Sequence, residues 1–210
     1  MSNYSSSGDL AERYIKVTPA GCYHAIESRD LTLLRQLLHR ILGESVTPAL
    51  SSHDGLERDD LTKLQGAGFI ELVQQPLSLP QGNLLSMLPQ ILPELSERSK
   101  ALLIESQQGL YLDFAGVSQS QAERLAVLAA ELRATADKTS SLLSGELSIA
   151  SHATAIVDPA GNSELGFWPL HIGDNVFSLI IAGIPRFNSE PFCTLVWALV
   201  ERYGQHHQHT

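Results

Sequence analysis

The residues of this sequence that are most capable of chemistry are histidines and aspartates in its second half. His152 and His171 fall on neighbouring predicted strands, from which they could approach Asp158 or Asp174. An imidazole held beside a carboxylate can act as a general base. However, no nucleophile at a strained turn and no acid at a fixed spacing accompanies these residues. We interpret both histidines as partly buried and hydrogen-bonded, and the sequence predicts no catalytic residue and no enzyme.

Metal and phosphate sites find little support in the sequence. His206, His207 and His209 could bind nickel or zinc adventitiously, but a terminal cluster lacks the fixed geometry of a structural site. The stretches GDLAER and QGAGFIE do not have the glycine spacing of a phosphate-binding loop. Arg186, beside Pro185, is only a loop candidate for an arginine finger. We therefore expect no cofactor and no bound metal.

The composition is that of an ordinary globular protein, because 43% of the 210 residues are hydrophobic and 18% are charged. No apolar run approaches the roughly 20 residues of a membrane helix. The N-terminus has no signal-peptide pattern, so a cytoplasmic location is expected. The net charge is −9, and both halves are acidic, which makes nucleic acid and anionic membranes unfavoured partners.

The two cysteines, Cys22 and Cys193, lie far apart in the sequence and have apolar neighbours. This placement fits reduced thiols that pack in the interior better than it fits a disulfide framework or a metal site.

Residues 13–80 form the first predicted domain, after a flexible polar tail at residues 1–12. Asp30 is the predicted N-cap of a helix over residues 31–42, and its expected apolar face is made by Leu31, Leu33, Leu34, Leu37, Leu38, Ile41 and Leu42. A shorter helix with Leu61 and Leu64 inward precedes glycine breakers and a strand over residues 69–73. The following QQPLSLP is expected to return as an edge strand.

This order of elements resembles a winged-helix domain, and LTKLQGAGFIELV carries the resemblance. Many winged helices place their third helix in the major groove of DNA. Here that helix carries Glu57, Asp59 and Asp60 against Arg58 and Lys63, so its surface is acidic. We expect the domain to make protein contacts or to be a structural appendage, with DNA binding as the alternative.

A domain boundary is predicted near residue 80, where prolines interrupt the apolar pattern of LLSMLPQILPEL. Residues 81–98 are predicted to be a linker that becomes a short helix. Met87, Ile91 and Leu95 are expected to pack, while Pro89 and Pro93 kink the segment or divide it into turns.

Residues 99–204 predict an alternation of strands and helices. ALLIESQQGLYLDFAG indicates a hairpin, and Leu110, Leu112 and Phe114 are expected on one face of its second strand, with Tyr111 and Asp113 on the other. A helix over about residues 120–143 follows, then three strands. The last helix begins after Asn188 or Ser189 and ends at Gly204, before a flexible tail at residues 205–210.

With the linker helix, the order is α-ββ-α-βββ-α, which resembles the roadblock/dynein light chain family over roughly residues 84–204. The resemblance rests on the hairpin above, on AERLAVLAAELRATADKTSSLL and on ATAIVDPAGNSELGFWPLHIGDNVFSLIIAG. It implies an α+β fold with a five-stranded antiparallel sheet flanked by helices. It also implies a non-enzymatic, dimeric protein that binds a small Ras-like GTPase or serves as a scaffold.

The long helix carries the predicted dimer interface. Its apolar stripe recurs at spacings of three and four residues and is made by Ala122, Leu125, Ala129, Leu132 and Ala136. Small residues let a second backbone approach closely, and a second copy of the helix is the natural candidate. The alternative is tight packing of the helix on its own sheet. In the last helix, Trp197 could be core or part of a partner surface.

Three functional hypotheses follow. The first is an interaction protein that dimerises through the roadblock-like domain and binds a small GTPase or another signalling partner. The second is a transcriptional regulator that uses the winged helix to read DNA. The third is a small-ligand sensor, because a five-stranded sheet flanked by helices is also the plan of several ligand-binding domains.

Overall fold

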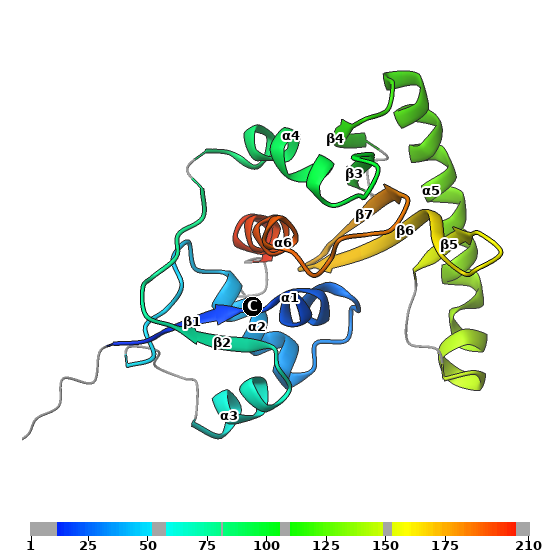
Figure 1. Cartoon of the computed structure of the whole chain (residues 1–210). Helices are drawn as coiled ribbons and strands as arrows, with labels where there is room; N and C mark the ends of the chain where they lie inside the picture. Colours follow the sequence, from blue (N-terminus) through cyan, green and yellow to red (C-terminus); the bar gives the residue numbers. More distant parts are fainter. Residues whose placement is uncertain (1–11, 52–57, 81, 106–109, 149–152, 205–210) are drawn as a thin grey trace, which may run out of the picture.

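The computed structural model describes residues 12–51, 58–80, 82–105, 110–148 and 153–204. Within these residues the fold is mixed α+β, with a five-stranded antiparallel sheet and a separate two-stranded sheet (Figure 1). The predicted α+β class and the five-stranded sheet are therefore confirmed. Most of the two predicted tails, and the turn at residues 106–109, lie outside the described residues.

The first part of the chain contains β1 (Tyr14–Val17), α1 (Pro19–Ile26), α2 (Leu33–Leu42), α3 (Arg58–Gly66) and β2 (Ile70–Val73). Thr18 begins α1, because its side chain accepts a hydrogen bond from Gly21 N at 3.2 Å and Pro19 occupies the first helical position. Gly21 allows a close approach to the segment before β2. A Cβ at Gly21 would lie 2.1 Å from the carbonyl oxygen of Phe69.

The predicted start of the second helix is wrong by two residues. Thr32, and not Asp30, is the N-cap of α2, and its hydroxyl accepts a hydrogen bond from Arg35 N at 3.4 Å. Leu31 and Leu33 are consequently exposed instead of belonging to the apolar face. The side of α2 that is buried consists of Arg35, Leu37, Leu38, Ile41 and Leu42.

The expected return strand after residue 73 is also wrong. β2 pairs with β1 in antiparallel register, from Tyr14 opposite Val73 to Val17 opposite Ile70. β1 alternates half-buried and buried residues, and each of its residues has a backbone N–H that can pair with a neighbouring strand. The segment QQPLSLP lacks this N–H at Pro76 and Pro80. Residues 77–79 instead hydrogen-bond to residues 45–47, with Thr47 N donating to Leu77 O at 2.8 Å.

The proline-rich connection is one uninterrupted helix, α4 (Leu84–Glu94). Its buried side repeats with helical period and includes Met87 and Ile91, and Leu95 directly after it is also buried, as expected. Pro89 and Pro93 do not divide the helix. They lie four residues apart and therefore on one side of it, and Pro89 is exposed. The hydrogen bonds that they remove are therefore lost away from the core, and burial of the other side outweighs that loss.

The main sheet contains β3 (Ala101–Glu105), β4 (Leu110–Ala115), β5 (Thr154–Val157), β6 (Ser163–Ile172) and β7 (Asn175–Ala182), in the order β4-β3-β7-β6-β5. The faces expected for β4 are wrong because the strand has an irregularity. Leu103 lies opposite Asp113 but Ile104 opposite Tyr111, so Leu112 has no partner residue on β3. Tyr111 and Phe114 consequently share a face, with ring centroids 5.3 Å apart.

Helices cover both faces of this sheet (Figure 1). α5 (Gln119–Ser140), which begins with a capping box at Ser118 and Gln121, lies on one face and continues into a π-helix at Ser141–Glu146. α4 and α6 (Glu190–Tyr203) lie on the other face. The buried cluster on the α5 side is small and contains Leu102, Ile104, Ala122, Ala126, Ala129, Phe167 and Ile180.

The larger buried cluster extends across the predicted boundary near residue 80. α6 contacts α1 and α2 of the first part as well as α4 and β6 of the second. Ile15 and Leu38 from the first part belong to the same cluster as Leu88, Phe177 and Leu199 from the second. The two parts of the chain thus share a hydrophobic core.

Candidate functional site

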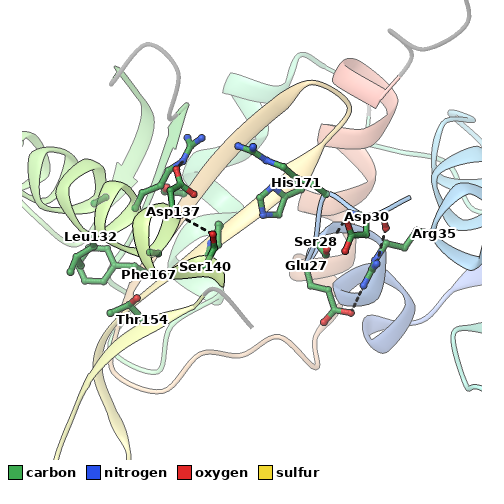
Figure 2. A pocket seen from close by; sticks show the side chains of 16 residues that line it. Glu27, Ser28, Asp30, Arg35, Leu132, Asp137, Ser140, Thr154, Phe167 and His171 are labelled. Carbon is green, nitrogen blue, oxygen red and sulfur yellow. Dashed lines mark hydrogen bonds and ion pairs between the residues drawn. The ribbon is translucent and has the colours of Figure 1, made fainter. Parts of the chain in front are cut away.

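A cavity of about 460 Å³ lies on the α5 side of the sheet. α5 covers only part of this face, and the connection between α1 and α2 supplies the wall opposite. Figure 2 shows Leu132, Phe167 and Thr154 grouped at one end and Glu27, Ser28, Asp30 and Arg35 at the other, with His171 between them. The end at Glu27, Ser28, Asp30 and Arg35 is the polar end of the cavity, and Leu132 and Phe167 make the other end partly apolar.

The buried side chain of Arg35 holds the residues of the polar end in place by hydrogen bonds. Its guanidinium donates to His24 O at 2.9 Å, to Asp30 O at 2.7 Å and to Glu27 Oε1 at 3.0 Å. The same Glu27 oxygen lies 2.8 Å from His24 Nδ1. Only 8% of Arg35 is exposed, so this charge is held inside the protein and its hydrogen bonds fix the course of residues 27–30.

The α5 wall combines an ion pair with apolar side chains. Arg133 Nε lies 3.8 Å from Asp137 Oδ2, one turn further along the helix. Ser140 Oγ donates to the carbonyl oxygen of Asp137 at 2.9 Å. Leu132 and Ala136 line the cavity on the same helix. Acidic and basic side chains around the cavity are equal in number, so its charge favours neither an anion nor a cation.

The floor of the cavity comes from β6 and β7. His171 is half-buried, and both of its ring nitrogens are shielded from solvent. Ser178 is buried on β7, beside Pro169 of β6. The sequence did not single out Ser178, Arg35 or residues 27–30 as site residues. One signal in the sequence could have indicated Arg35. It lies within the apolar run LLRQLLHRIL, and a buried charge requires a hydrogen-bonding or charged partner.

Of the two aspartates that His171 could approach, Asp158 is excluded, because it lies in the turn before β6 and His171 lies near the other end of that strand. Asp158 is occupied by the β5–β6 turn, where its carboxylate accepts hydrogen bonds from Ala160 N at 2.8 Å and from Asn162 N at 2.9 Å. Hydrogen bonds from Asn162 lower the pKa of Asp158 below its usual value. Asp174 lies in the turn next to His171. His152, His206, His207 and His209 lie outside the described residues.

The predicted dimer stripe packs mainly on the chain's own sheet. Ala122 and Ala129 are buried there, and Leu125 and Leu132 are half-buried against the same cluster. Ala136 is half-buried in the cavity wall. Contact of this stripe with a second copy stays a prediction. Only the half-buried residues Leu125, Leu132 and Ala136 have exposed surface for such a contact while the helix stays packed on its own sheet.

Trp197 joins the two parts of the chain. Its indole N–H donates to the carbonyl oxygen of Glu44 at 2.6 Å, and its ring packs on the larger buried cluster. The residue is half-buried and lines a second cavity of about 200 Å³. Much of the predicted partner surface at Trp197 is thus used within the chain.

Comparisons with known proteins do not assign this chain to a family. No family model matches this chain, and neither the curated proteins nor the solved structures include a match. In the part of the chain that the structure describes, no group of three or more His, Cys, Asp or Glu side chains is arranged to hold a metal ion. No helix among the described residues is long and apolar enough to cross a membrane.

Arg35 is expected to be essential for the polar wall of the 460 Å³ cavity. Replacing it in Arg35→Met should lower the free energy of unfolding by about 3 kcal/mol, because Glu27 and two carbonyl groups lose a charged donor. Arg29→Met is the matched control, since Arg29 is exposed in the same connection, and it should change stability by less than about 0.5 kcal/mol. Urea denaturation measures both. Equal effects would contradict this role for Arg35.

Proposed function

We propose that this protein is a non-enzymatic regulatory or scaffold protein that dimerises through a roadblock-like C-terminal domain and binds a small Ras-like GTPase or another signalling partner. The observation that carries the proposal is the edge of the main sheet at β5. All four residues of β5 are exposed, with Ile156 and Val157 at 58% and 55%. The order of elements, α4-β3-β4-α5-β5-β6-β7-α6, is the order that suggested the resemblance.

An apolar edge of this kind needs a partner. Among the described residues, β5 pairs with β6 alone, and its sequence TAIV contains no charge and no proline that would discourage another strand. A second copy, related by a two-fold axis, would pair β5 with β5 and extend the sheet without a break. The half-buried stripe residues Leu132 and Ala136 share the cavity wall with Thr154 of β5, so the predicted α5 contact and the β5 edge fit one interface.

We expect Ile156→Lys to convert a dimer into a monomer. The substitution places a charge in the proposed strand pairing, and the fold should tolerate it because Ile156 is exposed. Leu85→Lys is the matched control, since Leu85 is 54% exposed on α4, on the other side of the sheet. Light scattering coupled to size-exclusion chromatography gives the mass of each. A wild-type monomer, or a dimer that persists in Ile156→Lys, would overturn the proposed interface.

The partner is tested separately from the dimer. The wild-type protein should retain a Ras-like GTPase from native lysate, and the purified GTPase should bind again in its GDP or GTP-analogue state. If the dimer presents the binding surface, Ile156→Lys should lose this binding and Leu85→Lys should keep it. A wild-type dimer that binds no such GTPase in either nucleotide state would contradict the GTPase role. The scaffold role would then be the only part of the proposal that remains.

A small-ligand sensor is the second candidate, and the 460 Å³ cavity favours it because that volume lies in the range of small-molecule sites. A ligand from a panel of nucleotides, amino acids and sugars should raise the melting temperature of the wild type. Ala136→Trp fills the cavity and should abolish the rise. An equal rise in both proteins, or no rise with any compound, would exclude this cavity as the site.

DNA reading has no specific observation in its favour. On α3, Lys63 is paired with Asp60 at 3.2 Å, and Asp59 is exposed beside them. A phosphate backbone would therefore meet an acidic helix surface.

A further inference from the structure

The structure brings together the two cysteines, which lie far apart in the sequence. Cys22 is on α1 and Cys193 is on α6, and these helices pack directly against each other. Both are free thiols, 1% and 6% exposed, and both line one cavity of about 200 Å³. The pair therefore sits at the junction between the first part of the chain and its last helix.

The 200 Å³ cavity gives a small reagent access to the pair, because both cysteines line it. Lys16 and Glu190 line it too, and Lys16 Nζ lies 2.6 Å from Glu190 Oε1 and 3.0 Å from Glu71 Oε1. The thiols are thus buried from bulk solvent, but they line a cavity that Lys16 and Glu190 also line.

The two thiols differ in acidity. The hydrogen bond from Cys22 lowers the pKa of Cys193, although burial and the nearby Glu190 oppose this effect and Lys16 assists it. The pKa of Cys22 is raised by its hydrogen bond to Cys193 and by its burial. Cys193 is consequently the thiol that ionises first and attacks first.

We propose that Cys22 and Cys193 are a redox-active dithiol, which small disulfides oxidise to an intramolecular disulfide that joins α1 to α6. The Cys193 thiolate attacks one sulfur of the small disulfide, and a mixed disulfide forms as one small thiolate leaves. Cys22 then gives up its proton and attacks Cys193 Sγ, which displaces the second small thiolate. The protein loses two hydrogen atoms, and the small disulfide is reduced to two thiols.

The cross-link would close a loop of about 170 residues, a length at which a disulfide strongly restricts the unfolded chain. It would also fix the first part of the chain on α6, the helix that it shares with the second part. Oxidation would therefore stabilise the whole protein and not one part alone.

The test is oxidation of the native full-length protein with bis(2-hydroxyethyl) disulfide, followed by alkylation, intact mass and peptide mapping. The expected product is a single chain that is two hydrogens lighter, is not alkylated, contains a peptide in which Cys22 is joined to Cys193, and has a higher melting temperature than the reduced chain. Dithiothreitol should restore both thiols. This readout needs no variant, so it does not depend on the folding of one.

Single substitutions then test the order of steps. Cys22→Ser should stop at a mixed disulfide on Cys193, without the rise in melting temperature, and Cys193→Ser should react far more slowly. Three results with the wild type would overturn the proposal: both thiols remaining open to alkylation, a mixed disulfide that never closes, or a disulfide between two chains.

Discussion

The burial of α6 is the constraint on which the rest of the structure depends. Its sequence PFCTLVWALV is apolar nearly all the way round, so no single sheet face can cover it. Phe192, Leu195, Val196, Leu199 and Val200 are all fully buried. Each such side chain contributes roughly 1.5–3 kcal/mol when it leaves water, which makes exposure of any side of this helix costly. The main sheet covers one side, α4 another, and α1 and α2 the remainder.

The features at the junction follow from this arrangement. Because the first part of the chain completes the burial of α6, Trp197 can reach the carbonyl of Glu44 and Lys16 can reach Glu190. The same packing places Cys22 and Cys193 in the wall of one cavity. It also carries the connection between α1 and α2 past the uncovered end of the sheet, where Arg35 holds it as a wall of the larger cavity. The edge strand β5 contributes no residue to the larger buried cluster, and the proposed dimer forms at this edge.

Much of the secondary structure could be predicted from local pattern. The strands β6 and β7 and the helix α6 could be predicted, because glycine-containing turns and a serine N-cap separate continuous apolar runs. The pairing of β2 was not predicted, because its partner β1 lies nearly sixty positions earlier in the chain and only the adjacent segment was considered. The continuity of α4 was hidden by Pro89 and Pro93, whose effect depends on which side of the helix faces the core. The bulge at Leu112 left no local signal, and it places Tyr111 and Phe114, which were expected on opposite faces of β4, on the same face.

The cavity could not be predicted either, because its walls come from the α1–α2 connection, α2, α5 and the sheet, and no single segment carries a pattern for it. The cavity, the cysteine pair and the Trp197 contact all require that both parts of the chain share one core around α6. Native-state hydrogen exchange with peptide resolution tests this most directly. The most protected amides of α1 and α2 should exchange with the same free energy of opening as those of α6 and β7, in one global unfolding. Exchange of α1 and α2 at a much lower free energy, while α6 and β7 stay protected, would contradict it.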